Sequence, residues 1–340
     1  MMKTLIKTLL FVLTVVLLCQ CEKDDPQVTI PDDNFLNALI ELGVDTDGDG
    51  FISPAEAEVI ISLDVSGTWD TPGEIENLKG IEAFINLDTL YCNDNQLTTL
   101  DISNNTALKK LLCYGNQLTS LNVSKNTELT WLGCAFNKLT TIDVSNCTAL
   151  LRLFCHGNQL TTLDVSNNTA LWALECYRNN ILNLDVSINT ALIGLYCHKN
   201  KLSTLDISNN IALQGVMCWE NQLTALDVSN NTALQFLHCS DNQLTTLDVS
   251  NCTALYNMTC GYNQLTTLDV SNNTALLRLD CTGNQLTTLD LSNNTALNRL
   301  YLINIPSLFK VCVWEMPFPP TGVTADTTDS PNVYFTTDCN

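Results

Sequence analysis

Hydrophobic residues recur along most of this chain with a period of 21, and each period carries the same polar positions. The segment from Leu108 to Glu128 is a template for the period, reading L-x-x-L-x-C-x-x-N-x-L-x-x-L-N-V-S-x-N-T-x. A cysteine returns every 21 residues from Cys92 to Cys281, and an asparagine follows three residues behind each one. A fixed period of this length predicts a solenoid, in which each repeat forms one coil and stacks on its neighbours.

Each period is itself double. The spacing of Leu97, Leu100, Ile102 and Asn105 repeats that of the four residues ten positions earlier. The halves are too short to hold a strand, a turn and a helix. We therefore expect a strand around each ladder cysteine and a second extended segment or short strand in the Asp-Val-Ser half. The period-3 apolar pattern of residues 75–87 predicts a degenerate first coil after a loop over residues 66–74.

These motifs resemble the 21-residue bacterial leucine-rich repeats of the IRREKO type, with cysteine in the third apolar position. The resemblance covers residues 80–302. It implies a leucine-rich repeat solenoid that is mostly β, with a parallel sheet on the concave face and short extended segments on the other side. A small α-helical, EF-hand-like cap is expected at the N-terminal end of the solenoid.

Changes in pattern divide the chain into five parts. We predict a lipoprotein signal peptide over 1–20, an acidic tether over 21–31, an EF-hand-like helical cap over 32–65, leucine-rich repeats over 66–302 and a C-terminal cap over 303–340.

The N-terminus has the pattern of an export signal. Lys3 and Lys7 precede an apolar run that is too short to span a bilayer, and the run ends at Cys19-Gln-Cys21. Cys21-Glu-Lys-Asp-Asp resembles the signal that sends some Gram-negative lipoproteins to the outer face of the outer membrane. The resemblance implies acylation at Cys21, with Cys19 as the alternative, and a membrane contact through the lipid alone.

Residues 45–56 match a complete calcium-binding loop, D-x-[DN]-x-[DN]-G-x5-E. The ligands predicted from the motif are the side chains or backbone carbonyls of Asp45, Asp47, Asp49, Phe51, Ser53 and Glu56. One structural Ca²⁺ would tie the cap to the first coil. The alternative is an Asp-rich turn that only begins a helix.

The cysteine column is expected to act as a small buried hydrophobe. A single file of thiols cannot form a tetrahedral metal site, and parallel side chains about 4.8 Å apart do not converge as a disulfide requires. Cys147 and Cys252 replace asparagines of the second half and lie too far apart to pair. Cys312 and Cys339 lie outside the repeats, and we expect them to form a disulfide in an oxidising compartment.

The repeats differ mainly at outward positions beside the strands. The residues expected there on the concave face include every histidine of the chain, several aromatic residues and two cations: Phe154, His156, Tyr177, Arg178, Tyr196, His198, Lys199, Trp219 and His238. Large amphipathic side chains on one sheet face indicate a binding surface. The alternative is the ordinary preference of strands for aromatic residues.

The net charge and the arrangement of reactive residues argue against two classes of function, nucleic-acid binding and catalysis. The formal net charge of −21 argues against nucleic-acid binding, which requires clustered Lys and Arg. No serine or reactive cysteine stands in a pattern with a base and an orienting acid, so we expect no enzyme. The sequence favours a surface-displayed, non-catalytic protein that binds a protein partner through its concave sheet. The second hypothesis is that the sheet binds a glycan that stacks on Tyr177, Tyr196 and Trp219. The third is that the protein is a purely structural spacer.

Overall fold

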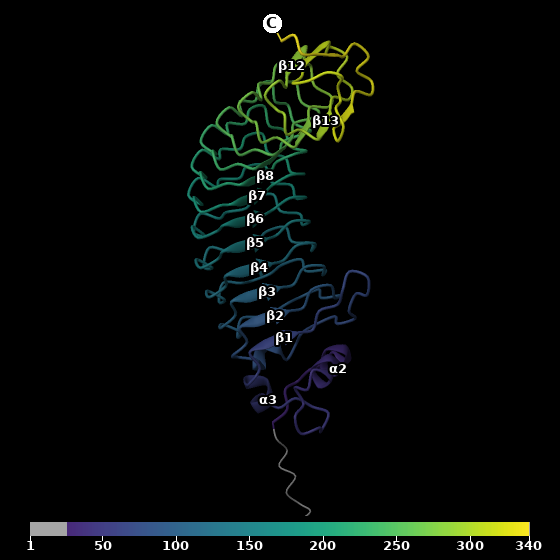
Figure 1. Cartoon of the computed structure of the whole chain (residues 1–340). Coiled ribbons are helices and arrows are strands. Elements are labelled where there is room, and N and C mark those ends of the chain that lie inside the picture. The colour runs from purple at the N-terminus through teal and green to yellow at the C-terminus, as the bar shows by residue number, and fades with distance from the viewer. Residues whose placement is uncertain (1–25, 340) are drawn as a thin grey trace, which may run out of the picture.

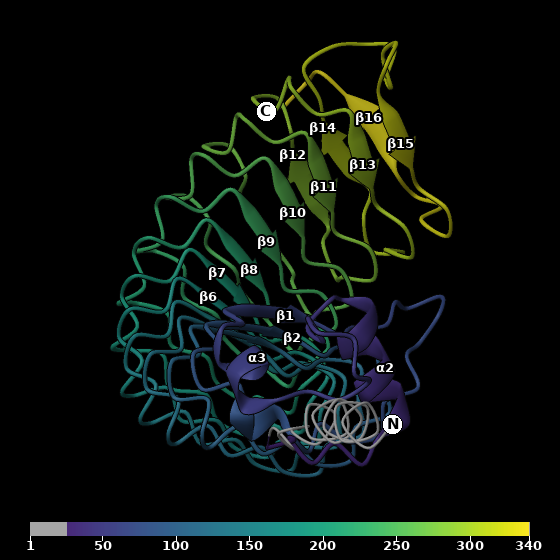
Figure 2. The ribbon, with the colours of Figure 1, turned by 90° about the horizontal axis from the view of Figure 1, so that it is seen from below.

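The computed structural model describes residues 26–339, which form one curved solenoid with a small helical cap at its N-terminal end (Figure 1). Within these residues, thirteen strands form one parallel sheet in the order β1-β2-β3-β4-β5-β6-β7-β8-β9-β10-β11-β13-β15. A second, three-stranded sheet has the order β12-β14-β16. Figure 2 shows the strands of the long sheet following the inner side of the curve, so this sheet is the concave face.

Every strand is three residues long. The strands of the long sheet are β1 (Ser62–Asp64), β2 (Thr89–Tyr91), β3 (Lys110–Leu112), β4 (Trp131–Gly133), β5 (Arg152–Phe154), β6 (Ala173–Glu175), β7 (Gly194–Tyr196), β8 (Gly215–Met217), β9 (Phe236–His238), β10 (Asn257–Thr259), β11 (Arg278–Asp280), β13 (Arg299–Tyr301) and β15 (Thr324–Asp326). Those of the short sheet are β12 (Thr288–Asp290), β14 (Lys310–Cys312) and β16 (Tyr334–Thr336).

The 21-residue period sets the register of the long sheet. Leu90 pairs with Leu111, and Leu111 with Leu132, so each strand aligns with the same positions of the next repeat. The middle residue of each strand and the ladder cysteine after it point into the core, where the cysteines are fully buried and free. Burial raises the pKa of the Cys134 and Cys197 thiols to about 12, so these thiols are unreactive at neutral pH.

The Asp-Val-Ser halves form extended segments, but they pair as strands only at the C-terminal end, in β12, β14 and β16. Among the earlier described coils a single bridge joins Asn122 to Asp143. Each half turns through its aspartate. Oδ1 of Asp164 accepts a hydrogen bond from the N–H of Ser166 at 2.8 Å, and Asp290 at the end of β12 accepts the same bond from Ser292 at 2.9 Å. The turn is therefore common to coils with and without pairing.

The N-terminal cap contains helices α2 (Asp33–Glu41) and α3 (Pro54–Glu58). Asp32 caps α2 by accepting from the N–H of Phe35, and its other carboxylate oxygen accepts from the N–H groups of Glu76 and Asn77. One side chain thus joins the cap to the first coil. The sheet begins at β1, inside the segment assigned to the cap, and the 3₁₀ helix η1 (Ile81–Ala83) lies in the degenerate coil. No helix of residues 26–339 is long and apolar enough to cross a membrane.

The C-terminal segment extends both sheets over the last repeat. Strand β15 pairs with β13, and β16 pairs with β14. Cys312 and Cys339 are joined as a disulfide, with their Cα atoms 5.5 Å apart. The bridge fastens the end of the chain to β14.

Candidate functional site

Five of the predicted surface residues form one continuous stack of rings across neighbouring coils. The ring centroids are 4.1 Å apart from His156 to Tyr177, 4.2 Å from Tyr177 to His198, 4.5 Å from His198 to Trp219 and 5.3 Å from Trp219 to His238. The interplanar angles run from 9° to 17°. The first four rings follow from the register, because each comes directly after a ladder cysteine and parallel strands place such equivalent side chains about 4.8 Å apart, close to ring-stacking distance. His238 comes directly before Cys239, and its ring extends the stack from the neighbouring column. We call these five residues the aromatic stack.

The histidines of the aromatic stack are neutral at physiological pH. Desolvation by burial lowers the pKa of His156, His198 and His238 to about 4 in each case. Nδ1 of His156 lies 3.4 Å from a carboxylate oxygen of Glu175, yet it makes no hydrogen bond, and a neutral imidazole forms no ion pair there. Uncharged rings can therefore stack without mutual repulsion.

Arg178 and Lys199 follow the stack at the corner where each strand ends. Their φ angles are 53° and 55°, in the left-handed region that glycine adopts without strain. Other repeats do have glycine at this corner, including Gly115 and Gly157. Nζ of Lys199 lies 4.7 Å above the Trp219 ring and 3.2 Å from a carboxylate oxygen of Glu220.

A second row of rings and cations was missed by the sequence analysis. The Arg152 guanidinium lies between two indoles, 4.5 Å from the ring centroid of Trp131 and 4.4 Å from that of Trp172. Nζ of Lys110 lies 3.8 Å above Trp131. We call Lys110, Trp131, Arg152 and Trp172 the cation–indole ladder. The signal was available, because Lys110, Trp131 and Arg152 directly precede the buried leucines and so must alternate outward.

A shallow hollow of about 480 Å³ opens on the concave sheet beside Arg152. Gly194 and Gly215 replace the bulky first strand residue of earlier repeats, and the Tyr196 ring lies within contact distance of both. The walls of the hollow include Phe154, Trp172, Tyr196, Phe236 and Tyr256. Phe154 and Tyr196 therefore belong to this hollow and not to the aromatic stack.

The two sides of the coil carry different charge. The concave side mixes both signs: its cations are Lys110, Arg152, Arg178, Lys199, Arg278 and Arg299, and its acids include Asp64, Asp94, Glu175, Glu220, Asp241 and Asp280. The second halves of the repeats expose a column of aspartates, consisting of Asp101, Asp143, Asp164, Asp185, Asp206, Asp227, Asp248, Asp269 and Asp290. Hydrogen bonds from the hydroxyl and N–H of Ser166 lower the pKa of Asp164, and its neighbours have the same arrangement. An acidic partner meets least repulsion on the concave side.

The predicted calcium loop brings three of its carboxylates together. One oxygen each of Asp45, Asp47 and Asp49 lies within 4.8 Å of the others. Glu56 instead accepts from Ser53 and Thr46; although desolvation acts to raise its pKa, these hydrogen bonds lower it to about 2. The aspartates fit a hard cation, whereas Glu56 caps α3. Phe51 and Ser53 occupy their expected places in the loop, with Ser53 as the N-cap of α3.

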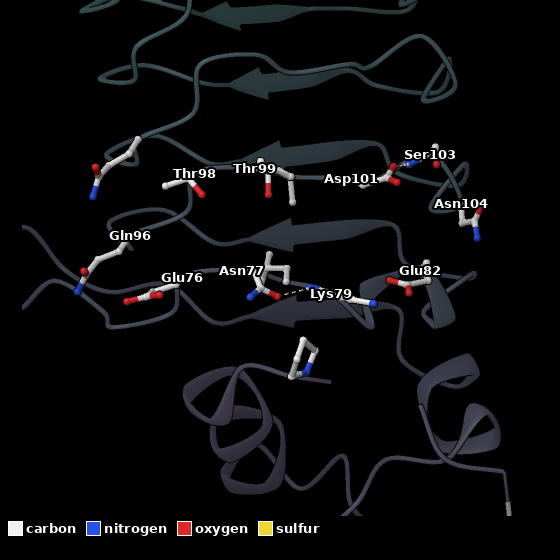
Figure 3. Close-up of a pocket in the computed structure, with 14 residues that line it drawn as sticks. Glu76, Asn77, Lys79, Glu82, Gln96, Thr98, Thr99, Asp101, Ser103 and Asn104 are labelled. Atoms are coloured by element: carbon white, nitrogen blue, oxygen red, sulfur yellow. Dashed lines mark hydrogen bonds between the residues drawn. The ribbon is translucent and has the colours of Figure 1, made fainter. Parts of the chain in front are cut away.

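A hollow of about 890 Å³ lies away from the concave sheet (Figure 3). It is lined by the degenerate coil and the second half of the next repeat, and none of its residues belongs to a strand. Glu76, Glu82 and Asp101 contribute carboxylates, and Lys79 contributes a cation. This open polar hollow has no grouping of nucleophile, base and orienting acid.

The predicted lipidation site, Cys21, and its alternative, Cys19, lie outside the described residues. All other predicted site residues are placed by the structure.

Comparison with known proteins agrees with this architecture. The functional domain of InlJ from Listeria monocytogenes, described as including a cysteine ladder, is 35% identical with a TM-score of 0.78, over 90% of this chain and 70% of that one. A leucine-rich repeat protein of Leptospira interrogans is 27% identical with a TM-score of 0.64, over 67% of this chain and 64% of that one.

A plant receptor is a more distant likeness. The ectodomain of the receptor kinase GASSHO1/SCHENGEN3 from Arabidopsis thaliana, in complex with CASPARIAN STRIP INTEGRITY FACTOR 2, is 25% identical with a TM-score of 0.64, over 77% of this chain and 34% of that one. The LVIVD repeat family matches residues 91–114, and no curated protein matches the sequence. The identity to the InlJ domain and its coverage show the family: this chain belongs to the bacterial leucine-rich repeat proteins with a cysteine ladder.

Proposed function

We propose that this protein is a non-catalytic binding protein that recognises a protein partner through the concave sheet. The observation that carries the proposal is the aromatic stack, which runs without a gap from His156 to His238. Rigid aromatic side chains provide contact area at low cost in conformational entropy, and such residues dominate protein interfaces. The complex of the Arabidopsis receptor ectodomain with CASPARIAN STRIP INTEGRITY FACTOR 2 supports a macromolecular ligand for this fold.

The stack favours a protein over a glycan. A sugar binds an aromatic residue by covering a ring face, but His156 and His198 already cover the faces of Tyr177. Trp219 lies between His198 and His238 in the same way. Because the faces of these rings are covered by their neighbours, only the ring edges are accessible to a ligand. The edges carry both polar and apolar atoms, which suits contact with the mixed surface of a protein.

The test compares Tyr177→Ala plus Trp219→Ala with Thr162→Ala in quantitative pull-downs from surface extracts of candidate partner cells. Truncation of two anchoring rings should cost about 1–3 kcal/mol each, which is roughly 5- to 150-fold in affinity per ring. A specific partner should be retained by wild type and by Thr162→Ala and lost by the double variant. Circular dichroism should show that both variants are folded. Equal retention by both would remove the stack as the binding surface and favour a structural spacer.

We also propose that the protein is anchored in the outer membrane through a lipid on Cys21 and is exposed at the cell surface. The motivating observation is the Cys21-Glu-Lys-Asp-Asp run after a short apolar segment. Labelled palmitate should enter wild type and Cys19→Ser but not Cys21→Ser, and proteases added to whole cells should degrade the wild-type protein. A Cys21→Ser protein that is still labelled and membrane-bound would contradict the assignment.

A further inference from the structure

The Arg152 side chain is held as a preformed anion-binding group. Its guanidinium carbon lies over the Trp131 ring at 4.5 Å from the ring centroid and over the Trp172 ring at 4.4 Å. Among the described residues, no carboxylate oxygen lies within the 4.0 Å of an ion pair from its nitrogens. An arginine without a carboxylate partner is unexpected in a chain of net charge −21. Its charge is therefore available to a ligand.

The chemistry of the guanidinium selects the kind of anion. Its two indole contacts hold the group in place, and its N–H donors are the atoms that can bind a ligand. These donors lie in one plane and match the two oxygens of a carboxylate. The flanking indoles fix the plane in advance, so little side-chain freedom is lost when the anion binds.

A hollow of mixed polarity lies directly beside the arginine, and Arg152 is itself one of its lining residues. Gly194 and Gly215 line its floor with the Tyr196 ring at contact distance, Trp172 and Phe236 provide further aromatic walls, and Glu175, Gln214 and Gln235 are its other polar lining residues. Its volume of about 480 Å³ accommodates one large apolar side chain with its backbone. The site therefore combines one pocket with aromatic walls and one cation at its rim.

We infer that Arg152 and this hollow form the primary docking site for an extended acidic segment of a protein partner. The segment places a large apolar side chain over Gly194 and Gly215, and an Asp or Glu carboxylate on the Arg152 edge. The inference rests on the proposed function, that the concave sheet binds a protein. Charge complementarity supports the acidic segment, because the exposed aspartate column repels it from the other side of the coil.

Glu175 sets the direction in which the segment lies. Its carboxylate also lines the hollow and lies 3.4 Å from Nδ1 of His156. A ligand carboxylate is repelled from that side and is attracted to the Arg152 side. Glu175 can accept a hydrogen bond from a backbone N–H of the segment.

The probe for the experiment is a display library of random twelve-residue peptides, selected on the full-length protein. Enriched sequences should place Asp or Glu within a few residues of Phe, Tyr, Trp, Leu or Met. A synthetic enriched peptide should bind about 10- to 100-fold more weakly when its acid is replaced by the amide, because charge-assisted hydrogen bonds are lost. Arg152→Gln should weaken the acidic peptide by a similar factor and leave the amide peptide unchanged.

A second variant tests the hollow independently of charge. Gly215→Leu fills the floor, and a Cβ there meets the Tyr196 ring at 3.7 Å, an ordinary contact that the fold tolerates. Arg152 and Trp131 occupy the same strand position in other repeats, so a large residue is compatible with the sheet. Peptide binding should fall at least 10-fold, whereas Thr162→Leu on the second half of a repeat should leave it unchanged.

The outcomes separate this inference from the proposed function. Enrichment of peptides without acids, or equal binding by Arg152→Gln and wild type, overturns the inference. If binding is then lost with Tyr177→Ala plus Trp219→Ala, the proposed function still holds at the aromatic stack. Failure to enrich any peptide also contradicts the inference, and so does Arg152-dependent binding of sialyllactose in place of peptides.

Discussion

Replacing Asn158 by cysteine is expected to destabilise the protein by roughly 2–4 kcal/mol, whereas replacing Asn168 by cysteine should cost about 1 kcal/mol or less. Both asparagines are buried and both hydrogen-bond to backbone between coils. They differ in how many of their polar atoms are used. The two ladders to which they belong therefore tolerate substitution differently.

Asn158 uses both ends of its amide. Its Nδ2 donates to the carbonyl oxygens of Cys134 and Cys155 at 3.0 Å each, and its Oδ1 accepts from the N–H of Leu139 at 3.0 Å. A thiol is a single weak donor and cannot make the same three bonds. The variant leaves the Leu139 N–H buried without a partner.

Asn168 uses only its donor end. Its Nδ2 donates to the carbonyl oxygens of Val144 and Cys147 at 3.0 Å and 2.8 Å, while its Oδ1 has no partner. The chain already contains cysteines in this ladder, at Cys147 and Cys252. Sγ of Cys147 lies 3.7 Å and 3.6 Å from the equivalent carbonyl oxygens, of Val123 and Asn126. A donor alone is sufficient there.

Urea unfolding of the two variants, followed by far-ultraviolet circular dichroism, measures the difference in free energy. Hydrogen exchange at the Leu139 amide provides a local readout, since this N–H should exchange faster only in Asn158→Cys. Equal stability of the two variants, with slow exchange at Leu139 in both, would show that the acceptor end of Asn158 contributes nothing.

The sequence was sufficient to predict the coil and the buried cysteines, because both follow from a strict period. It was not sufficient to predict how the outward side chains of neighbouring coils meet. The columns of His156, Tyr177 and Trp219 were predicted, but stacking depends on the spacing and orientation of the strands. Arg152 was not among the predicted surface residues, because it precedes the buried leucine of its strand and the predicted residues all follow that leucine. The hollow depends on Gly194 and Gly215, which carry no chemical signal of their own.

The sequence also did not predict which second halves of the repeats pair as strands. An extended segment or a short strand was expected throughout, but paired strands form only in β12, β14 and β16. The Asp-Val-Ser pattern is the same in coils with and without pairing. Pairing begins where the C-terminal cap supplies β14 and β16 as further strands. The difference is set by the neighbouring coil and not by the repeat itself.

The last expected result concerns the N-terminal cap, where we propose one structural Ca²⁺ in the loop of Asp45, Asp47 and Asp49. The carboxylate oxygens of these residues converge within 4.8 Å. The N–H of Asp49 acts to lower the pKa of Asp47, but burial and the nearby charges of Asp49, Glu56 and Asp45 outweigh it and raise that pKa. Like charges held together destabilise the empty loop, and a bound cation would reverse this effect. At a hundredfold excess over Kd the gain is about 2.7 kcal/mol.

A double variant, Asp47→Asn plus Asp49→Asn, tests this proposal. Each of these side chains accepts one backbone hydrogen bond through a single oxygen, from the N–H of Asp49 and of Phe51, and an amide oxygen can still accept it, so mainly the charges are removed. In chelator the variant should be at least as stable as wild type, because repulsion is relieved. In millimolar Ca²⁺ the order should reverse, since only the wild type gains by binding. Asp164→Asn, in the exposed aspartate column, should leave the Ca²⁺ effect unchanged. Thermal unfolding in chelator measures the effect of charge repulsion on stability. Thermal unfolding in Ca²⁺, together with calorimetric titration, measures the stability gained by Ca²⁺ binding. The proposal would be contradicted if the wild-type protein showed no heat of Ca²⁺ binding and melted at the same temperature with and without chelator. The loop would then be only a turn that precedes α3.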